Sequence, residues 1–226
     1  MKTAILIDGG FYRIVANQLW KNKVPNIRAD ELITYCQLHI KQSKSELYRI
    51  YYYDCPPISK KVFMPIANKT IDLSKKPLYT WATDFFTELK TKRKVSLRLG
   101  VLADSMAHYN IKPDVTKKIC NGTIKVKDLT EDDFELKVEQ KGVDIKIGLD
   151  IATLAYKKQV DQIILISGDS DFVPVAKFAR REGIDFILDA MGRTIREDLQ
   201  EHIDGLRNQI KHMYKRRLLN TKKKAK

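Results

Sequence analysis

The sequence predicts a doubly wound α/β domain with a mostly parallel central sheet. Two continuous apolar runs, Ala4–Ile7 and Ile163–Ile166, have the length and composition of strands that are buried on both faces. Segments with helical periodicity separate these runs from each other and from a third short strand over residues 183–188. Buried strands that alternate with amphipathic helices are typical of a parallel sheet covered by helices.

The first half of the chain alternates in this way after the first apolar run. Apolar residues at helical spacing predict the helices, and aromatic richness predicts the strand that three consecutive tyrosines mark. Two prolines close that strand because proline cannot donate to a strand ladder. The predicted elements are helices over 11–20, 30–40 and 78–92 and strands over 46–53 and 95–102.

Residues 103–140 break the rhythm and are predicted to form an insertion. The pair Asn121-Gly122 within it is a strong signal for a tight hairpin turn. The regular alternation returns after the insertion. The elements predicted there are helices over 143–157, 171–181 and 195–210 and strands over 163–166 and 183–188.

The net charge of +14 is concentrated at the end of the chain. Residues 207–226 contain nine Lys and Arg and no acid, whereas the other 206 residues contain 33 basic and 28 acidic side chains. The charge therefore predicts a folded domain over 1–206 and a basic tail over 207–226. Such tails attract phosphate backbones without regard to sequence, and a solvated, solubilising end is the alternative.

Several classes of protein are excluded by composition. No apolar run approaches the roughly 18 residues that span a bilayer, and the first apolar run is too short for a secretory signal. Cys36, Cys55 and Cys120 form no C-x-x-C pair, which argues against a disulfide framework and a structural zinc site. We expect a cytoplasmic protein that does not associate with membranes.

Acidic residues follow two of the buried strands. Asp8 comes directly after the first strand, and Asp169 and Asp171 come after the second, each beside glycine or serine. The carboxyl ends of parallel strands form the usual site in such sheets. Asp171 also starts a helix, where a capping or first-turn role is the alternative.

The helix predicted over 143–157 supplies further candidates. Asp144 lies at its start, and Gly148 one turn later leaves space above a carboxylate that points inward. Asp150 lies about 120° around the helix and is the weaker candidate, with a surface pair to Lys146 as its alternative.

A pocket of converging carboxylates would require cations. Like charges roughly 5 Å apart repel by about 3 kcal/mol at an effective dielectric constant of ~20. Oxygen ligands suit Mg²⁺ or Mn²⁺, which commonly bind one or two carboxylates together with substrate phosphate. The four acids Asp8, Asp144, Asp169 and Asp171 are thus predicted to hold such an ion for phosphodiester hydrolysis.

These motifs resemble the NYN domain family. The resemblance rests on Ile7-Asp8-Gly9-Gly10, Lys141-Gly142-Val143-Asp144 with Asp150, and the run from Ser167 to Phe172. Within that family, the motifs resemble most specifically the bacterial LabA/DUF88 branch. The family belongs to the PIN-like nuclease superfamily. The resemblance implies a PIN-like three-layer α/β/α fold, bound Mg²⁺ or Mn²⁺, and cleavage of RNA, with Asp8, Asp144, Asp169 and Asp171 as the catalytic and metal-binding acids.

One position departs from the family pattern. Many members have asparagine three residues after the first aspartate, and here that residue is Phe11. An exposed Phe11 would stack on a base, and a core position is the favoured alternative. The contacts expected for RNA phosphates, each with an ordinary surface role as its alternative, are Lys141, Lys146, Arg193, Arg196, Lys215, Arg216 and Arg217.

The motifs of two other α/β protein classes do not match this sequence. A phosphatase of the haloacid dehalogenase type needs a second acid where Gly10 stands, and the chain lacks the glycine pattern of dinucleotide-binding proteins. We therefore expect a metal-dependent ribonuclease that acts on single-stranded RNA. A non-catalytic RNA-binding regulatory protein is the alternative, and the sequence leaves a homodimer open.

Overall fold

The computed structural model describes residues 1–103, 107–138 and 140–216, and it divides the chain into two compact units. The first unit comprises Met1–Asp54, Asp84–Gly100 and the chain from Gly142 onwards, and the second comprises Cys55–Thr83 and Val101–Lys141. The second unit therefore includes residues 55–83 in addition to the segment predicted as an insertion over 103–140.

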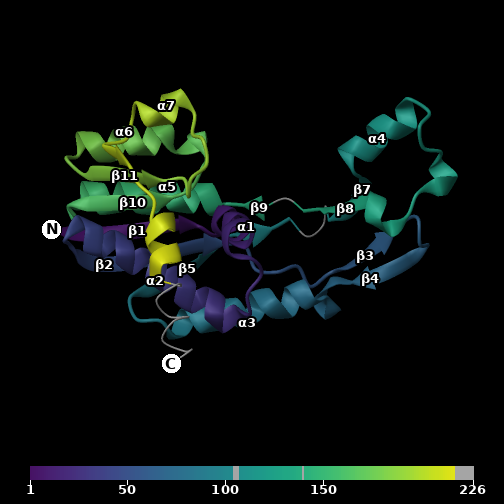
Figure 1. Cartoon of the computed structure of the whole chain (residues 1–226), viewed down its shortest axis with the longest axis horizontal. Helices are drawn as coiled ribbons and strands as arrows, with labels where there is room; N and C mark the ends of the chain where they lie inside the picture. Colours follow the sequence, from purple (N-terminus) through teal and green to yellow (C-terminus); the bar gives the residue numbers. More distant parts are fainter. Residues whose placement is uncertain (104–106, 139, 217–226) are drawn as a thin grey trace. The chain divides into compact units, whose positions relative to one another are not determined.

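Six parallel strands form the central sheet of the first unit, in the order β12-β11-β10-β1-β2-β5 (Figure 1). Ile7 of β1 pairs with Ile166 of β10, and Asp8 pairs with Tyr53 of β2, so these strands end at the same edge. The α/β class with a parallel sheet is confirmed. The strands are β1 (Lys2–Asp8), β2 (Glu46–Asp54), β5 (Val95–Leu99), β10 (Gln162–Ile166), β11 (Asp185–Asp189) and β12 (Gly205–Leu206).

Helices flank this sheet on both faces. The chain moves from β1 to β2 in one direction and from β10 to β11 in the other, so right-handed crossovers place α1 and α2 opposite α6. Helix α5 packs on β1, β2, β5 and α6. In the described part of the chain, no helix combines the length and apolar character needed to cross a bilayer. The helices are α1 (Gly9–Trp20), α2 (Pro25–Ser43), α3 (Pro77–Thr91), α5 (Val143–Tyr156), α6 (Val173–Arg181) and α7 (Glu197–Gln200).

The two apolar runs form the centre of the core. Residues 4–7 of β1 and 163–166 of β10 are fully buried, as expected for strands covered on both faces. Tyr52 of β2 is also fully buried and packs edge-on against Tyr12 of α1 and Phe85 of α3. This packing fixes the ends of β1 and β2 relative to the helix that follows Asp8.

The second unit is built from short antiparallel pairs. Strand β3 (Lys61–Met64) pairs with β4 (Lys69–Asp72), and β7 (His108–Ile111) pairs with β8 (Phe134–Lys137). The hairpin predicted at Asn121-Gly122 is wrong. Gly122 has a φ of +75° and follows helix α4 (Pro113–Cys120), where its N–H donates to the Ile119 carbonyl, so the pair ends a helix.

The helix predicted over 195–210 is also wrong. Helix α7 ends at Gln200, and the chain continues as β12 because β11 offers an edge for pairing. Beyond β12, Gln209 and Met213 are buried, and Tyr214 donates a hydrogen bond to the Leu19 carbonyl at 2.9 Å. The segment predicted as a basic tail from residue 207 thus packs on the first unit as far as Tyr214, and residues 217–226 lie outside the described part.

Candidate functional site

Four acidic side chains gather at the carboxyl edge of the sheet in the first unit. Asp8, Asp54 and Asp189 are the last residues of β1, β2 and β11, and Asp169 follows β10 by three residues. Parallel strands bring such residues to the same edge, where ligands of open α/β sheets bind. The hydrogen-bond and ion-pair partners of each carboxylate show which acids stabilise the fold and which are candidates for binding a cation or for catalysis.

Asp54 has a structural role. Its side chain is buried and receives two contacts from the Arg13 guanidinium, at 3.0 Å to Oδ1 and 2.9 Å to Oδ2. The hydroxyl of Tyr52 donates to Oδ2 at 3.3 Å. A bidentate arginine neutralises this carboxylate, so it fixes α1 against β2 and is not free for a ligand.

Asp189 is likewise satisfied within the fold. Tyr35 donates its hydroxyl to Oδ2 at 2.6 Å, His39 Nε2 lies 2.7 Å from the same oxygen, and the Met191 N–H donates to Oδ1 at 2.7 Å. The side chains of Asp189 and His39 are completely buried. This cluster connects α2 to the end of β11, and it could not be predicted because Tyr35 and His39 lie about 150 residues from Asp189 in the chain.

Asp8 differs from both of these acids. It is the N-cap of α1, where Oδ1 accepts a hydrogen bond from the Phe11 N–H at 3.1 Å, and Oδ2 faces the Ser167 hydroxyl at 3.4 Å. Burial raises the pKa of Asp8, the Phe11 N–H opposes that rise, and the negative charges of Asp144 and Asp54 add to it. Asp8 has no cationic partner among the described residues.

Ser167 connects Asp8 to Asp169. The fully buried hydroxyl of Ser167 faces Asp8 and also accepts a hydrogen bond from the Asp169 N–H at 3.2 Å. Oδ1 of Asp169 in turn accepts from the Asp171 N–H at 3.0 Å and caps the short helix η5 (Ser170–Phe172). Ser167 is a positioning residue that the sequence analysis missed, although it lies within the Ser-Gly-Asp-Ser-Asp motif. Asp171 occupies the first turn of η5, which is its alternative structural role.

Asp144 is electrostatically coupled to the other three acids. It lies in the first turn of α5, and burial raises its pKa, with the negative charges of Asp169 and Asp171 adding to the rise. The same carboxylate contributes to the raised pKa of Asp8. A Cβ at Gly148 would meet no atom within 4 Å, so the space predicted one turn after Asp144 is open, whereas the Asp144 residue predicted to point inward is exposed. Asp144 therefore interacts electrostatically with each of the other three predicted acids.

The donor chemistry of these acids suits a hard divalent cation. Among the described residues, no three His, Cys, Asp or Glu side chains form a group that could hold a metal ion. Mg²⁺ commonly takes only one or two carboxylates and completes its shell with water and substrate phosphate. The described residues thus do not bring the four predicted acids together as one complete ligand set, and a bound ion would need water and substrate phosphate to complete its shell.

Asp150 lies apart from this cluster. Its Oδ2 accepts a hydrogen bond from the Tyr53 hydroxyl at 2.7 Å and pairs with Arg98 Nε at 3.3 Å. The pair suggested with Lys146 is replaced by these contacts, and the Lys146 ammonium instead donates to the Leu99 carbonyl. Asp150 therefore anchors α5 to β2 and β5.

The predicted phosphate contacts are dispersed. Arg196 pairs with Asp198 at 2.9 Å, whereas Arg193 is exposed near the end of β11. Lys141 belongs to the second unit, and Arg217 lies outside the described residues. Lys215 and Arg216 are exposed in the helical segment over 210–216.

Phe11 is part of this site and not part of the core. Its side chain is half-buried at the start of α1, two residues after Gly9. The ring lies against Gly168, because a Cβ at position 168 would come within 2.7 Å of Phe11 Cε2. The ring is therefore neither fully buried, as the favoured core position requires, nor exposed, as the alternative requires.

The six-stranded parallel sheet flanked by helices is the fold of a PIN-like α/β domain. Residues 64–206, more than half of the chain, match the NYN domain family, and the chain belongs to that family. The matched range includes Asp144, Asp169 and Asp171 and begins after Asp8.

The chain is similar to the crystal structure of a protein of unknown function from Vibrio parahaemolyticus, at 17% identity and a TM-score of 0.48. The alignment covers 91% of this chain and 90% of that one. No curated protein matches the chain.

Proposed function

We propose that this chain is a metal-dependent ribonuclease of the LabA branch that hydrolyses phosphodiester bonds of single-stranded RNA. One observation carries the proposal. Asp8, Asp144, Asp169 and Asp171 have no cationic partner among the described residues, whereas the neighbouring strand-end acid Asp54 is neutralised by Arg13. An uncompensated group of acids is costly to fold and is useful where a cation and an anionic substrate arrive together. Membership of the NYN family supports nuclease chemistry at the level of the superfamily.

The four acids have different tasks in this proposal. Asp8 and Asp169 are held by Ser167 and by backbone N–H groups, so they supply fixed oxygens to the cation. Mg²⁺ or Mn²⁺, when bound, polarises the phosphoryl group and lowers the pKa of a water molecule. Asp171 is exposed and contributes through the electric field of the cluster or through water.

Proton transfer falls to Asp144. The reaction adds water across one P–O bond, so one product gains a terminal phosphate and the other gains a hydroxyl group. The attacking water must lose a proton, and Asp144 is exposed and accepts no hydrogen bond within the described residues. Its raised pKa makes it a better proton acceptor than an ordinary aspartate.

Phe11 supplies a surface for a nucleobase beside these acids. Its half-buried ring lies against Gly168, between the turn after β1 and the turn after β10. Stacking of a base on an aromatic ring is worth about 1–3 kcal/mol and tolerates any base. Phe11 therefore orients single-stranded RNA, in which bases are free to stack. The proposed phosphate contacts are Lys146, Arg193 and Arg196, with Lys141, Lys215, Arg216 and Arg217 as further contacts.

A cleavage assay tests the proposal. Labelled single-stranded RNA is incubated with the full chain and Mn²⁺, with and without EDTA, and double-stranded RNA of the same sequence serves for comparison. We expect cleavage of the single strand that EDTA abolishes and that Asp8→Asn and Asp169→Asn each reduce at least about a hundredfold. Asp30→Asn is the matched control, because Asp30 is an exposed acid on α2.

Two outcomes would contradict the proposal. Cleavage that survives both substitutions would identify a contaminating nuclease. RNA binding without metal-dependent cleavage would instead favour a non-catalytic RNA-binding regulatory protein on the same fold.

A further inference from the structure

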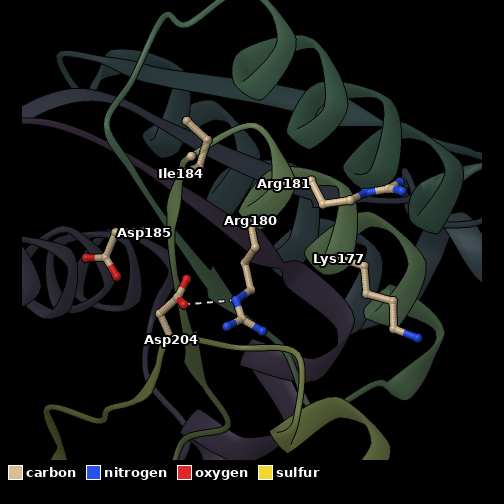
Figure 2. A pocket seen from close by; sticks show the side chains of 7 residues that line it. Lys177, Arg180, Arg181, Ile184, Asp185 and Asp204 are labelled. Atoms are coloured by element: carbon tan, nitrogen blue, oxygen red, sulfur yellow. Dashed lines mark hydrogen bonds and ion pairs between the residues drawn. The ribbon is translucent and has the colours of Figure 1, made fainter.

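An open groove of about 670 Å³ lies where α6 ends and β11 begins (Figure 2). It is at the amino edge of the sheet, because Asp185 is the first residue of β11, whereas the acidic site lies at the carboxyl edge. The side chains that line it are Lys177, Arg180, Arg181, Ile184, Asp185 and Asp204.

The acids of the groove are already engaged. Asp204 accepts a hydrogen bond from Arg180 Nε at 2.9 Å and another from the Phe186 N–H at 2.8 Å. Asp185 accepts from the Gln162 amide at 2.5 Å, and its carboxylate points away from the three cations in Figure 2. The carboxylates of the groove therefore do not neutralise Lys177 or Arg181.

Lys177 and Arg181 form an unpaired basic face. They are four residues apart on α6, both are exposed, and Figure 2 shows both side chains extending to the same side of the helix. Neither makes an ion pair within the described residues. Glu182, the acid next to Arg181, is paired instead with Lys158 at 3.6 Å.

Helix capping does not account for these cations. Basic residues near a helix C-terminus can bond its last carbonyl groups. At the end of α6, backbone N–H groups of Glu182, Gly183 and Ile184 already donate to the carbonyl groups of Phe178, Arg180 and Ala179. Gly183 adopts a φ of +80°, which makes this turn possible. Lys177 and Arg181 are therefore available for a ligand.

We propose that Lys177 and Arg181 bind the phosphodiester backbone of an RNA strand whose other end lies at the acidic site. The inference rests on the proposed function and extends it to the path of the substrate. Helix α6 joins the two places, because η5 with Asp171 directly precedes it and Arg181 ends it. Its nine residues span about 13 Å at 1.5 Å per residue. A single strand of a few nucleotides is therefore long enough to connect the groove to the cluster.

Phosphate groups could also reach the groove as a free nucleotide. The shared chemistry is a phosphate that accepts charge-assisted hydrogen bonds from arginine and lysine. Two features favour the backbone of a strand. The groove is open rather than enclosed, and its cations follow one another along a helix that starts at the candidate site.

The test measures RNA affinity over a series of salt concentrations. The full chain with Asp8→Asn and without metal is used as parent, so that cleavage does not interfere. The test variant adds Lys177→Ala and Arg181→Ala, which break no contact within the described residues. The matched control adds Lys41→Ala and Lys157→Ala, which remove the same charge from exposed positions on α2 and at the end of α5.

A twelve-nucleotide single strand is the probe. We expect the test variant to bind it about tenfold more weakly at 0.1 M salt and to lower the slope of log K against log salt by ~1.4, since each lost contact with a single strand contributes ~0.7. The control should retain the slope of the parent. A slope that is the same in the test variant and the parent would overturn the inference, as would a nucleoside monophosphate that competes as strongly as the twelve-nucleotide strand.

The inference and the proposed function fail in different ways. A reduced slope in a protein that never cleaves RNA supports the groove and contradicts the nuclease. Metal-dependent cleavage with an unchanged slope supports the nuclease and overturns the groove.

Discussion

The ring of Phe11 occupies the space that a side chain at position 168 would need. A Cβ added to Gly168 would lie 2.7 Å from Phe11 Cε2 and 3.4 Å from two further ring atoms. The φ of Gly168 lies outside the left-handed region, so its backbone conformation does not itself demand glycine. Contact with Phe11, between the turns after β1 and β10, is the reason for glycine at this position.

This contact predicts a strong coupling between the two residues. Gly168→Ala should lower the free energy of unfolding by about 1–3 kcal/mol, because the ring must move out of a packed position. Phe11→Ala removes the obstacle, so the double variant should lose less than the two single losses together, with a coupling of about 0.5–3 kcal/mol. Urea denaturation of the unaltered protein, the two single variants and the double variant measures this coupling energy.

Gly148→Ala is the matched control. A Cβ there meets nothing within 4 Å, and alanine in a helix is more stable than glycine by about 0.5–1 kcal/mol. Additive losses at 168 and 11 would show that the two side chains do not share this space.

Asp8 combines a helix cap with a candidate cation ligand, and two substitutions separate these roles. Asp8→Asn keeps the cap because asparagine accepts the Phe11 N–H equally well, whereas Asp8→Ala should cost about 1 kcal/mol of stability. Both should reduce RNA cleavage. Thermal denaturation and the cleavage assay together distinguish the roles, and a stable Asp8→Asn protein with full activity would remove Asp8 from the chemistry.

Asp189 should be far more important for stability than for chemistry. Asp189→Ala leaves the Tyr35 hydroxyl, His39 and the Met191 N–H without their partner in the core, which should cost about 3 kcal/mol or more. Asp30→Ala breaks an exposed ion pair with Lys92 and should cost at most about 1 kcal/mol. If Asp189→Ala and Asp30→Ala lower the free energy of unfolding equally in urea denaturation, the structural role assigned to Asp189 is contradicted.

The basic end of the chain can be shortened without disturbing the contacts of Gln209, Met213 and Tyr214. Removal of residues 217–226 deletes five of the nine basic residues found after position 206. We expect an unchanged melting temperature. The slope of log K for RNA binding against log salt should fall by up to ~3.5, because each of the five lost contacts with a single strand contributes ~0.7. Removal of residues 207–226 should also lower the melting temperature. An unchanged slope in the shorter deletion would show that this end does not contact RNA.

Much of the fold could be predicted because its determinants are local. The apolar runs of β1 and β10 are continuous, and their burial on both faces follows directly from that composition. Strand β12 could not be predicted, since two residues form a strand only because the edge of β11 is available. The Asn-Gly pair after α4 misled the prediction because the same left-handed backbone closes both hairpins and helices.

The candidate site could be predicted in part. Strand-end position marks Asp8 and Asp54 equally, and only the contact with Arg13, 41 residues away from Asp54, shows that the latter is neutralised. Ser167 lies in a recognisable motif, but its link between Asp8 and Asp169 depends on the register of β1 and β10. Such long-range pairing has no local signature in a single sequence.

The most direct test of the proposed cation site is a crystal of the full chain soaked in Mn²⁺, with data collected at a wavelength where manganese scatters anomalously. We predict an anomalous peak in contact with carboxylate oxygens of Asp8 and at least one of Asp144, Asp169 and Asp171, and no such peak in the Asp8→Asn protein. A manganese ion bound elsewhere, with these four carboxylates left without one, would contradict the account.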